Sequence, residues 1–217
     1  MKRSSAISLL GSYPPRLCGI ATFTRDLRSA LAEFQPDSGC SVLSVTDPGR
    51  SYDYPPEVRF EIPEPDLLSY LRAADFLNLS RSDVLCVQHE FGIYGGPAGS
   101  HLIGLLRRTR MPKVITLHTI LERPDEDQRR VFLELIDCAT RLVCMSQKGR
   151  ELLRKIYQTP EEKIAVIPHG IPDVPLVDPE SHKEQFDVAG RPVLLTFGLL
   201  SPGKGVEYAI EALPAIA

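Results

Sequence analysis

Short runs of apolar and β-branched residues recur along the chain. They cover residues 6–10, 41–45, 84–87, 114–117, 142–145, 164–167 and 193–197. Runs of this length that are apolar at nearly every position are typical of strands buried on both faces of a parallel sheet. The pattern therefore predicts a strand at each of these places.

Between these runs, apolar residues return at the three- and four-residue spacing of amphipathic helices. The helices predicted in this way span residues 20–34, 102–106, 132–139, 152–156 and 206–213. Strand and helix alternate almost throughout, which predicts an α/β fold with a Rossmann-like, doubly wound parallel sheet. Such sheets bind their ligands at the carboxyl ends of the strands, so we expect the functional residues there.

The pattern changes near Gly170, and a chain of 217 residues is long for one domain and short for two. Several prolines then punctuate a polar stretch that is typical of a linker. A last helix reaches Ala217 without a glycine cap. We expect an N-terminal domain over residues 1–172, a linker over 173–191, and the first strand and helix of a truncated second domain over 192–217.

Composition narrows the function classes. Hydrophobic residues make up 43% and charged residues 24% of the chain, as in ordinary globular proteins. The formal charge of −3 and the scattered basic residues predict no nucleic-acid partner. The first apolar run is too short for a signal peptide or a membrane span, so we expect a cytoplasmic protein. The five widely spaced cysteines indicate neither a disulfide framework nor a zinc site.

Residues 198–205, Gly-Leu-Leu-Ser-Pro-Gly-Lys-Gly, come close to a phosphate-binding P-loop. Gly205 stands where that motif needs a Ser or Thr, and too few residues follow for the rest of an ATPase fold. A glycine-rich turn with a lysine before a helix still suits an anion. A plain turn with a solvated lysine is the competing interpretation.

Residues 13–23 connect the first strand to the first helix, where a doubly wound fold places a ligand. Gly19 allows a substrate to approach the backbone closely, while Pro14 and Pro15 stiffen the loop. The segment is no dinucleotide fingerprint, because it lacks the three glycines. A Pro-Gly connection without any ligand is equally compatible with the sequence.

Polar clusters follow two of the predicted strands. Residues 88–96, Gln-His-Glu-Phe-Gly-Ile-Tyr-Gly-Gly, come after one strand, and His118 comes after another. A single strand-end histidine is usually structural, whereas two on successive strands favour a binding cleft. His89, Glu90, His118 and His169 lack the short spacings of a zinc site, and no G-x-S-x-G elbow indicates a serine hydrolase.

The motifs, taken in order, resemble the retaining glycosyltransferases of family four, which have the GT-B fold. The resemblance rests on Pro-Pro-Arg-x-Cys-Gly-Ile-Ala-Thr-Phe, His-Glu-Phe-Gly, Thr-Leu-His-Thr, Cys-Met-Ser, Val-Ile-Pro-His-Gly-Ile and Gly-Leu-Leu-Ser-Pro-Gly-Lys-Gly. It implies an acceptor-binding N-terminal domain and a donor-binding C-terminal domain. It also implies transfer of a hexosyl group from a nucleotide diphosphate sugar to a hydroxyl of a glycan, lipid or small molecule, with no cofactor and no metal.

The resemblance assigns roles to individual residues. His118 matches the histidine beside the transferred sugar and is the expected catalytic residue. Leu199 stands where the family usually has an arginine. The expected acceptor-binding residues are Gly19, His89, Glu90, Tyr94, Gly95 and Gly96, and the expected donor-phosphate residues are Gly19, Ser201 and Lys204. A fixed lysine and helix amides would stabilise the leaving diphosphate without a metal.

Two other functions are compatible with the same residues. A GT-B-fold sugar-nucleotide epimerase would use similar histidines without an acceptor, and a non-catalytic carbohydrate- or phosphate-binding module would need no reaction at all. The resemblance places the family's paired glutamates after Ala217, so we expect the 217-residue chain to be inactive alone. A peripheral membrane contact and pairing of two chains through the apolar helix of residues 206–213 are further expectations.

Overall fold

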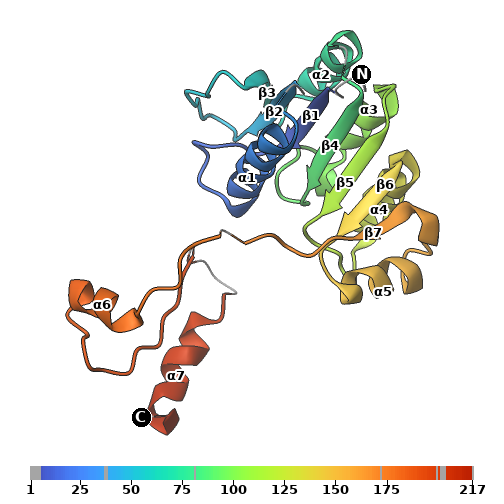
Figure 1. Ribbon diagram of the computed structural model, residues 1–217. Coiled ribbons are helices and arrows are strands. Elements are labelled where there is room, and N and C mark those ends of the chain that lie inside the picture. Colours follow the sequence, from blue (N-terminus) through green and yellow to red (C-terminus); the bar gives the residue numbers. More distant parts are fainter. Residues whose placement is uncertain are drawn as a thin grey trace. The chain divides into compact units, whose positions relative to one another are not determined.

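The computed structural model describes residues 6–36, 39–80, 82–171, 173–198, 200 and 204–216 (Figure 1). The chain divides into two compact units, Met1–His169 and Gly170–Ala217. The expected boundaries at residues 172 and 191 stay predictions about domains.

The first unit contains one sheet of parallel strands in the order β3-β2-β1-β4-β5-β6-β7. The predicted doubly wound, Rossmann-like fold is confirmed, because this order runs outward in both directions from the β1–β4 pair. The strands are β1 (Ile7–Gly11), β2 (Cys40–Thr46), β3 (Val58–Pro63), β4 (Val84–His89), β5 (Lys113–Leu117), β6 (Arg141–Cys144) and β7 (Ile164–Val166).

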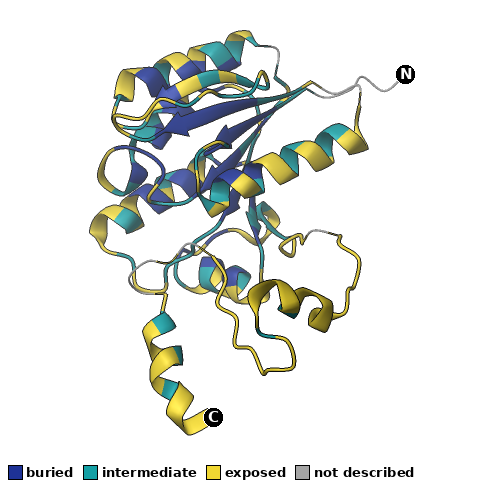
Figure 2. Ribbon diagram, turned by 90° about the vertical axis from the view of Figure 1, so that its left-hand side faces the viewer, coloured by how far each residue is buried: buried dark blue, intermediate teal, exposed yellow. Residues whose placement is uncertain are grey.

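Helices cover both faces of this sheet, as Figures 1 and 2 show. Leu9 packs with Leu27 and Leu31 of α1, whereas the next residue, Leu10, belongs to the larger cluster on the other face. Side chains of α2, α3, α4 and α5 fill that larger cluster. The helices are α1 (Gly19–Phe34), α2 (Leu67–Leu79), α3 (His101–Arg108), α4 (Glu126–Cys138) and α5 (Gln147–Lys155), with short 3-10 turns η1 (Pro97–Gly99) and η2 (Glu161–Lys163).

Two elements of the first unit escape the pattern of apolar runs. Strand β3 lies at the sheet's edge and alternates exposed and covered positions, so it lacks a continuous apolar run. Helix α2 follows and is capped by Asp66, whose side chain accepts a hydrogen bond from the Leu68 amide. An N-capping Asp ahead of an apolar helical period is a signal that the sequence does carry.

The second unit contains α6 (Pro179–Lys183), η3 (Glu184–Phe186) and α7 (Val206–Ile216). The helix expected at residues 206–213 is confirmed. The strand expected at residues 193–197 is wrong, since the described residues 192–198 form no regular element. A strand needs a neighbour to pair with its backbone and cover its side chains. Among the described residues of this unit there is no such strand, and Val193, Leu195 and Phe197 are exposed.

Helix α7 leaves Tyr208, Ile210 and Ile216 each more than 60% exposed. An uncovered apolar face of this kind is what pairing of two chains would require, and that pairing stays a prediction. No helix in the part of the chain that the structure describes is both long enough and apolar enough to cross a membrane.

The reversal of strand order at β1 and β4 determines where a ligand site can form. The chain leaves the carboxyl end of β1 toward one side of the sheet, and it leaves the end of β4 toward the other. The two loops therefore diverge at the carboxyl edge, which is where doubly wound sheets bind ligands. Gly19, His89 and His118 all lie along this edge.

Candidate functional site

Strands β4 and β5 bring the two predicted histidines next to each other. His89 is the last residue of β4, and His118 follows Leu117, the last residue of β5. The His118 amide donates to the His89 carbonyl oxygen at 3.0 Å, which extends the parallel ladder by one step. The two strand-end positions expected from the sequence are confirmed, and the pairing of β4 with β5 makes the histidines neighbours.

The half-buried imidazole of His118 is held from two directions. Its Nε2 lies 2.9 Å from Oε1 of Gln88, and the ring of Phe23 meets it edge-on with 4.8 Å between centroids. Phe23 makes a second edge contact, at 5.2 Å, with His169. Desolvation, with a smaller contribution from the charge of His169, lowers the pKa of His118 to about 4. The ring is consequently neutral at pH 7.

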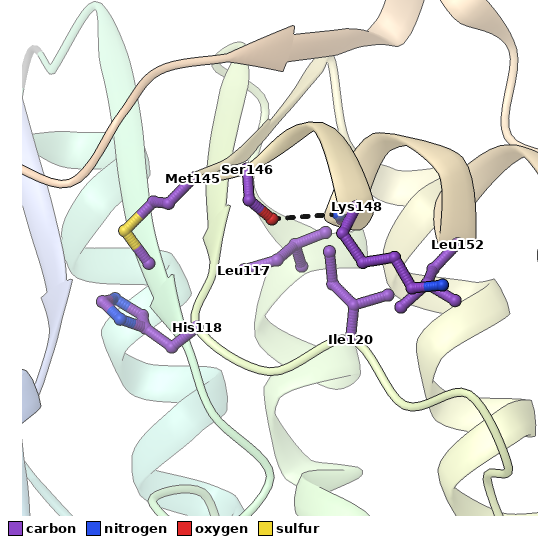
Figure 3. Close-up of a pocket in the computed structure, with 8 residues that line it drawn as sticks. Leu117, His118, Ile120, Met145, Ser146, Lys148 and Leu152 are labelled. Carbon is purple, nitrogen blue, oxygen red and sulfur yellow. Dashed lines mark hydrogen bonds between the residues drawn. The ribbon is translucent and has the colours of Figure 1, made fainter.

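His118 also borders a small cavity at the ends of β5 and β6 (Figure 3). The cavity measures about 180 Å³, less than the roughly 300–1,000 Å³ of a complete ligand pocket. In Figure 3 the His118 ring lies beside Met145, and Lys148 lies farther along the wall. Ser146 caps α5 by accepting a hydrogen bond from the Gly149 amide at 3.0 Å. The lining residues are Leu117, His118, Ile120, Met145, Ser146, Lys148, Gly149 and Leu152.

Glu90 connects the loops that follow β4 and β5. One of its carboxylate oxygens accepts a hydrogen bond from the Phe91 amide at 3.0 Å, and the other accepts one from the Thr119 hydroxyl. Its carboxylate is thus engaged by the chain itself and fixes the turn beside His118. The acceptor-binding role expected for Glu90 stays a prediction.

His89 lies deeper than its neighbour and is only 1% exposed. The rings of Phe91, Tyr94 and Phe132 surround it, and its Nδ1 has no hydrogen-bond partner among the described residues. Desolvation, followed by the charge of His118, lowers the pKa of His89 to about 3. Its imidazole therefore offers almost no surface to a ligand in this structure, and its expected contact with an acceptor stays a prediction.

The glycine-rich turn after β4 has a packing reason of its own. Tyr94 is 3% exposed and donates to the Gln88 carbonyl oxygen at 2.8 Å, while the Gly95 amide donates to the Tyr70 hydroxyl at 2.9 Å. A Cβ on Gly95 would lie 2.0 Å from the carbonyl oxygen of Glu64. Gly96 has a φ of 79°, a backbone conformation that residues with a side chain rarely adopt. The expected contacts of Tyr94, Gly95 and Gly96 with an acceptor stay predictions.

Gly19 is exposed and forms the first residue of α1. Cys18 caps this helix through its Sγ, which accepts a hydrogen bond from the Ala21 amide at 3.2 Å. Nothing lies within 4 Å of the place where a Cβ of Gly19 would be, so the amino end of α1 opens outward. The amides of Gly19 and Ile20 have no hydrogen-bond partner among the described residues, so this end of the helix suits an anion.

Arg16, which the sequence analysis overlooked, anchors the loop in front of α1. Its guanidinium donates to the Ser12 hydroxyl at 3.0 Å and pairs with Asp47 at 2.6 Å, and its side chain is only 12% exposed. Asp47 follows β2 directly. The sequence does show an arginine in the loop after β1 and an acid just after β2. That the two side chains pair could not be predicted, because it depends on β1 and β2 being neighbours in the sheet.

The residues expected to bind the donor phosphates do not all lie in the first unit, which contains Gly19. Lys204 is exposed and belongs to the second unit, and Ser201 and Leu199 lie outside the described residues. The structure therefore leaves the grouping of Gly19, Ser201 and Lys204 as a prediction. In the described residues no three His, Cys, Asp or Glu side chains gather as metal ligands would.

One protein family matches more than half of the chain. The family described as Glycosyltransferase Family 4 matches residues 17–173. This range contains Gly19, the β4 cluster and His118. A comparison with curated protein sequences found no significant match.

Solved structures with a similar fold have longer chains, and this chain spans less than half of their length. An alpha-glucosyltransferase in complex with UDP-glucose and DNA containing an abasic site has a TM-score of 0.52 and 14% identity, and the match covers 75% of this chain and 42% of that one. An alpha-glucosyltransferase in complex with UDP has a TM-score of 0.50 and 17% identity, covering 80% of this chain and 43% of that one. At these identities the likeness shows the fold, that of half a GT-B glycosyltransferase.

Replacing Gly95 by Ala should destabilise the first unit by about 2 kcal/mol or more, because the added methyl would overlap a backbone carbonyl that cannot yield freely. Chemical denaturation followed by circular dichroism measures the effect. Gly92→Ala is the matched control, since nothing lies within 4 Å of its Cβ position and its φ is ordinary. Equal stabilities of the two variants would contradict the packing explanation of Gly95.

Stability should fall as the pH is lowered from about 6.5 to about 3. The unfolded chain binds a proton at the ordinary histidine pKa near 6.5, whereas the folded chain resists protonation of His89 until about pH 3. His118 adds a loss in the same direction down to about pH 4. In the His89→Leu variant the slope of unfolding free energy against pH should decrease, by up to about 1.4 kcal/mol per pH unit.

Denaturant titrations at several pH values test this slope. His182→Gln, which changes an exposed histidine of α6, serves as the control and should keep the slope of the unaltered chain. An unaltered slope in His89→Leu would show that His89 is not the buried group that resists protonation.

Proposed function

The chain belongs to glycosyltransferase family 4, and we propose that the protein transfers a hexosyl group from a nucleotide diphosphate sugar to an acceptor hydroxyl. We propose that the transfer retains the configuration of the sugar. The observation that carries the proposal is the position of His118. A neutral histidine borders a cavity at the carboxyl edge of the sheet, and Phe23, near the amino end of α1, packs against the same histidine. Retention and the hexose rest on the family resemblance alone.

The reaction needs groups that stabilise a departing diphosphate. Negative charge develops on its oxygens as the bond to the sugar breaks, and preorganised donors lower the free energy of that state. We assign this role to the first amides of α1 at Gly19 and to Lys204, with Ser201 as a further donor. Helix α1 has 16 residues, so its dipole and free amides favour an anion at this end.

His118 is the expected catalytic residue of the first unit. A neutral imidazole accepts or donates a hydrogen bond to a sugar hydroxyl without bringing a positive charge, and its low pKa keeps it neutral throughout the physiological range. We propose that it orients the transferred sugar, while the turn of residues 89–96 shapes the acceptor side through its packed glycines. The co-substrate is a nucleotide sugar, and no metal or other cofactor is assigned a role.

Product analysis tests the proposal on the protein that contains this whole chain. A panel of nucleotide diphosphate sugars is incubated with and without glycan, lipid and small-molecule acceptors, and release of the nucleoside diphosphate is measured. Acceptor-dependent release with a new glycosidic bond of the donor's anomeric configuration supports the proposal. An epimerised sugar from donor alone would replace it with an epimerase, and binding without any product would replace it with a binding module.

His118→Ala should lower kcat about 100-fold or more, the scale for losing a positioned polar group at a transition state. Steady-state kinetics with the preferred donor and acceptor measure it. His182→Ala, an exposed histidine of α6, is the control for substituting a histidine as such. An unchanged kcat in His118→Ala would make His118 a structural residue.

A further inference from the structure

We propose that Gln88 is a positioning residue for His118. Its side-chain oxygen accepts the Nε2–H of the imidazole, which leaves Nδ1 as the hydrogen-bond acceptor offered to a substrate hydroxyl. The catalytic consequence rests on the proposed function, whereas the hydrogen bond and the tautomer are properties of this chain alone.

Gln88 is confined on every side that the structure describes. It is fully buried in β4, between β1 and β5. Its Cβ lies 3.0 Å from the place where a Cβ of Gly11 would be, so the glycine makes room for it. Its backbone oxygen accepts the Tyr94 hydroxyl at 2.8 Å. The carboxamide oxygen, 2.9 Å from Nε2 of His118, is thereby held at one point.

Packing alone does not explain a glutamine at this position. The Nε2 of Gln88 is buried and has no hydrogen-bond partner among the described residues. A buried amide with an unpaired N–H opposes folding, and a methionine of similar length would fill the space without that cost. Among the described groups, the Gln88 side chain bonds only with His118. Buried polar groups without a full set of hydrogen bonds are typically found where a functional group has to be held in place.

The tautomer follows from simple hydrogen-bond accounting. A neutral imidazole has one N–H and one lone pair, and the carboxamide oxygen of Gln88 can only accept. The proton therefore resides on Nε2, and Nδ1 carries the lone pair. Nδ1 makes no hydrogen bond within the part of the chain that the structure describes. The Phe23 ring, edge-on to the imidazole, limits rotation of the ring.

The surrounding charges are consistent with this neutral arrangement. Phe23 contacts the rings of both His118 and His169, and the charge of His169 acts on His118. The buried His89 ends β4, and the charge of His118 acts on it. The Glu90 carboxylate is directed to Thr119 and to its own turn. The hydrogen bonds of the Glu90 carboxylate do not reach the His118 ring, and within the described residues Gln88 is hydrogen-bonded to its Nε2.

Nitrogen-15 NMR of the 217-residue chain at pH 7 tests the arrangement directly. The His118 signals are assigned by their loss in His118→Asn. In the unaltered chain we expect the proton on Nε2 and slow exchange of that proton with water. In Gln88→Met we expect exchange to accelerate about tenfold or more, the effect of losing one hydrogen bond. A proton on Nδ1 in the unaltered chain, or unchanged exchange in Gln88→Met, overturns the proposal.

Two further variants separate this effect from general destabilisation. Gln88→Glu retains an acceptor oxygen and should restore slow exchange of the Nε2 proton. Thr109→Val removes another buried hydrogen bond, from the Thr109 hydroxyl to the Leu106 carbonyl oxygen, and should leave the His118 signals as they are. Faster exchange in Thr109→Val as large as that in Gln88→Met would overturn the proposal.

Kinetics of the active protein then test the consequence for catalysis. Gln88→Met should lower kcat about tenfold with little change in the donor KM, because a misoriented imidazole still allows the donor to bind. A confirmed hydrogen bond with unchanged kcat overturns the positioning role. If the unaltered protein transfers no sugar, the proposed function fails while the NMR result still decides the tautomer.

Discussion

The pairing of β1 with two neighbours is the constraint on which the rest of the molecule depends. Strand β1 forms parallel ladders with β2 on one side and β4 on the other, so the chain must cross the sheet in opposite directions from this pair. The connecting loops diverge at the carboxyl edge for that reason. Arg16 then anchors the loop after β1 to Asp47, and Glu90 fixes the turn after β4. Strand order thus determines which loops meet at this edge before any ligand is considered.

Different degrees of burial give the two adjacent histidines, His89 and His118, different properties. His89 ends its strand among aromatic rings, so loss of hydration suppresses its protonation, and it has few groups to bond with. His118 lies one step farther along the ladder, where it keeps some exposure, a hydrogen bond to Gln88 and one side of a cavity. The neutral charge of both rings has the same cause, desolvation, but only His118 combines neutrality with access.

Local pattern accounted for most of the fold. Continuous apolar runs predicted β1, β2, β4, β5, β6 and β7, because central parallel strands are covered on both faces. The same criterion missed β3, whose edge position leaves alternate side chains exposed, and it wrongly predicted a strand at residues 193–197. In both cases the deciding quantity was whether a neighbouring strand was present. That information is nonlocal and is absent from the residues themselves.

The candidate site was likewise predictable from the sequence only where local signals sufficed. The sequence by itself determined that Gly19, His89 and His118 would end or follow elements at the carboxyl edge of one sheet, because strand ends and helix starts are marked by local signals. Only the tertiary structure decided that His89 is buried, that Gly95 and Gly96 serve close packing, and that Gln88 holds His118. Those properties depend on which distant atoms surround a side chain, such as Glu64 beside Gly95 and Gly11 beside Gln88, and folding alone brings such atoms together.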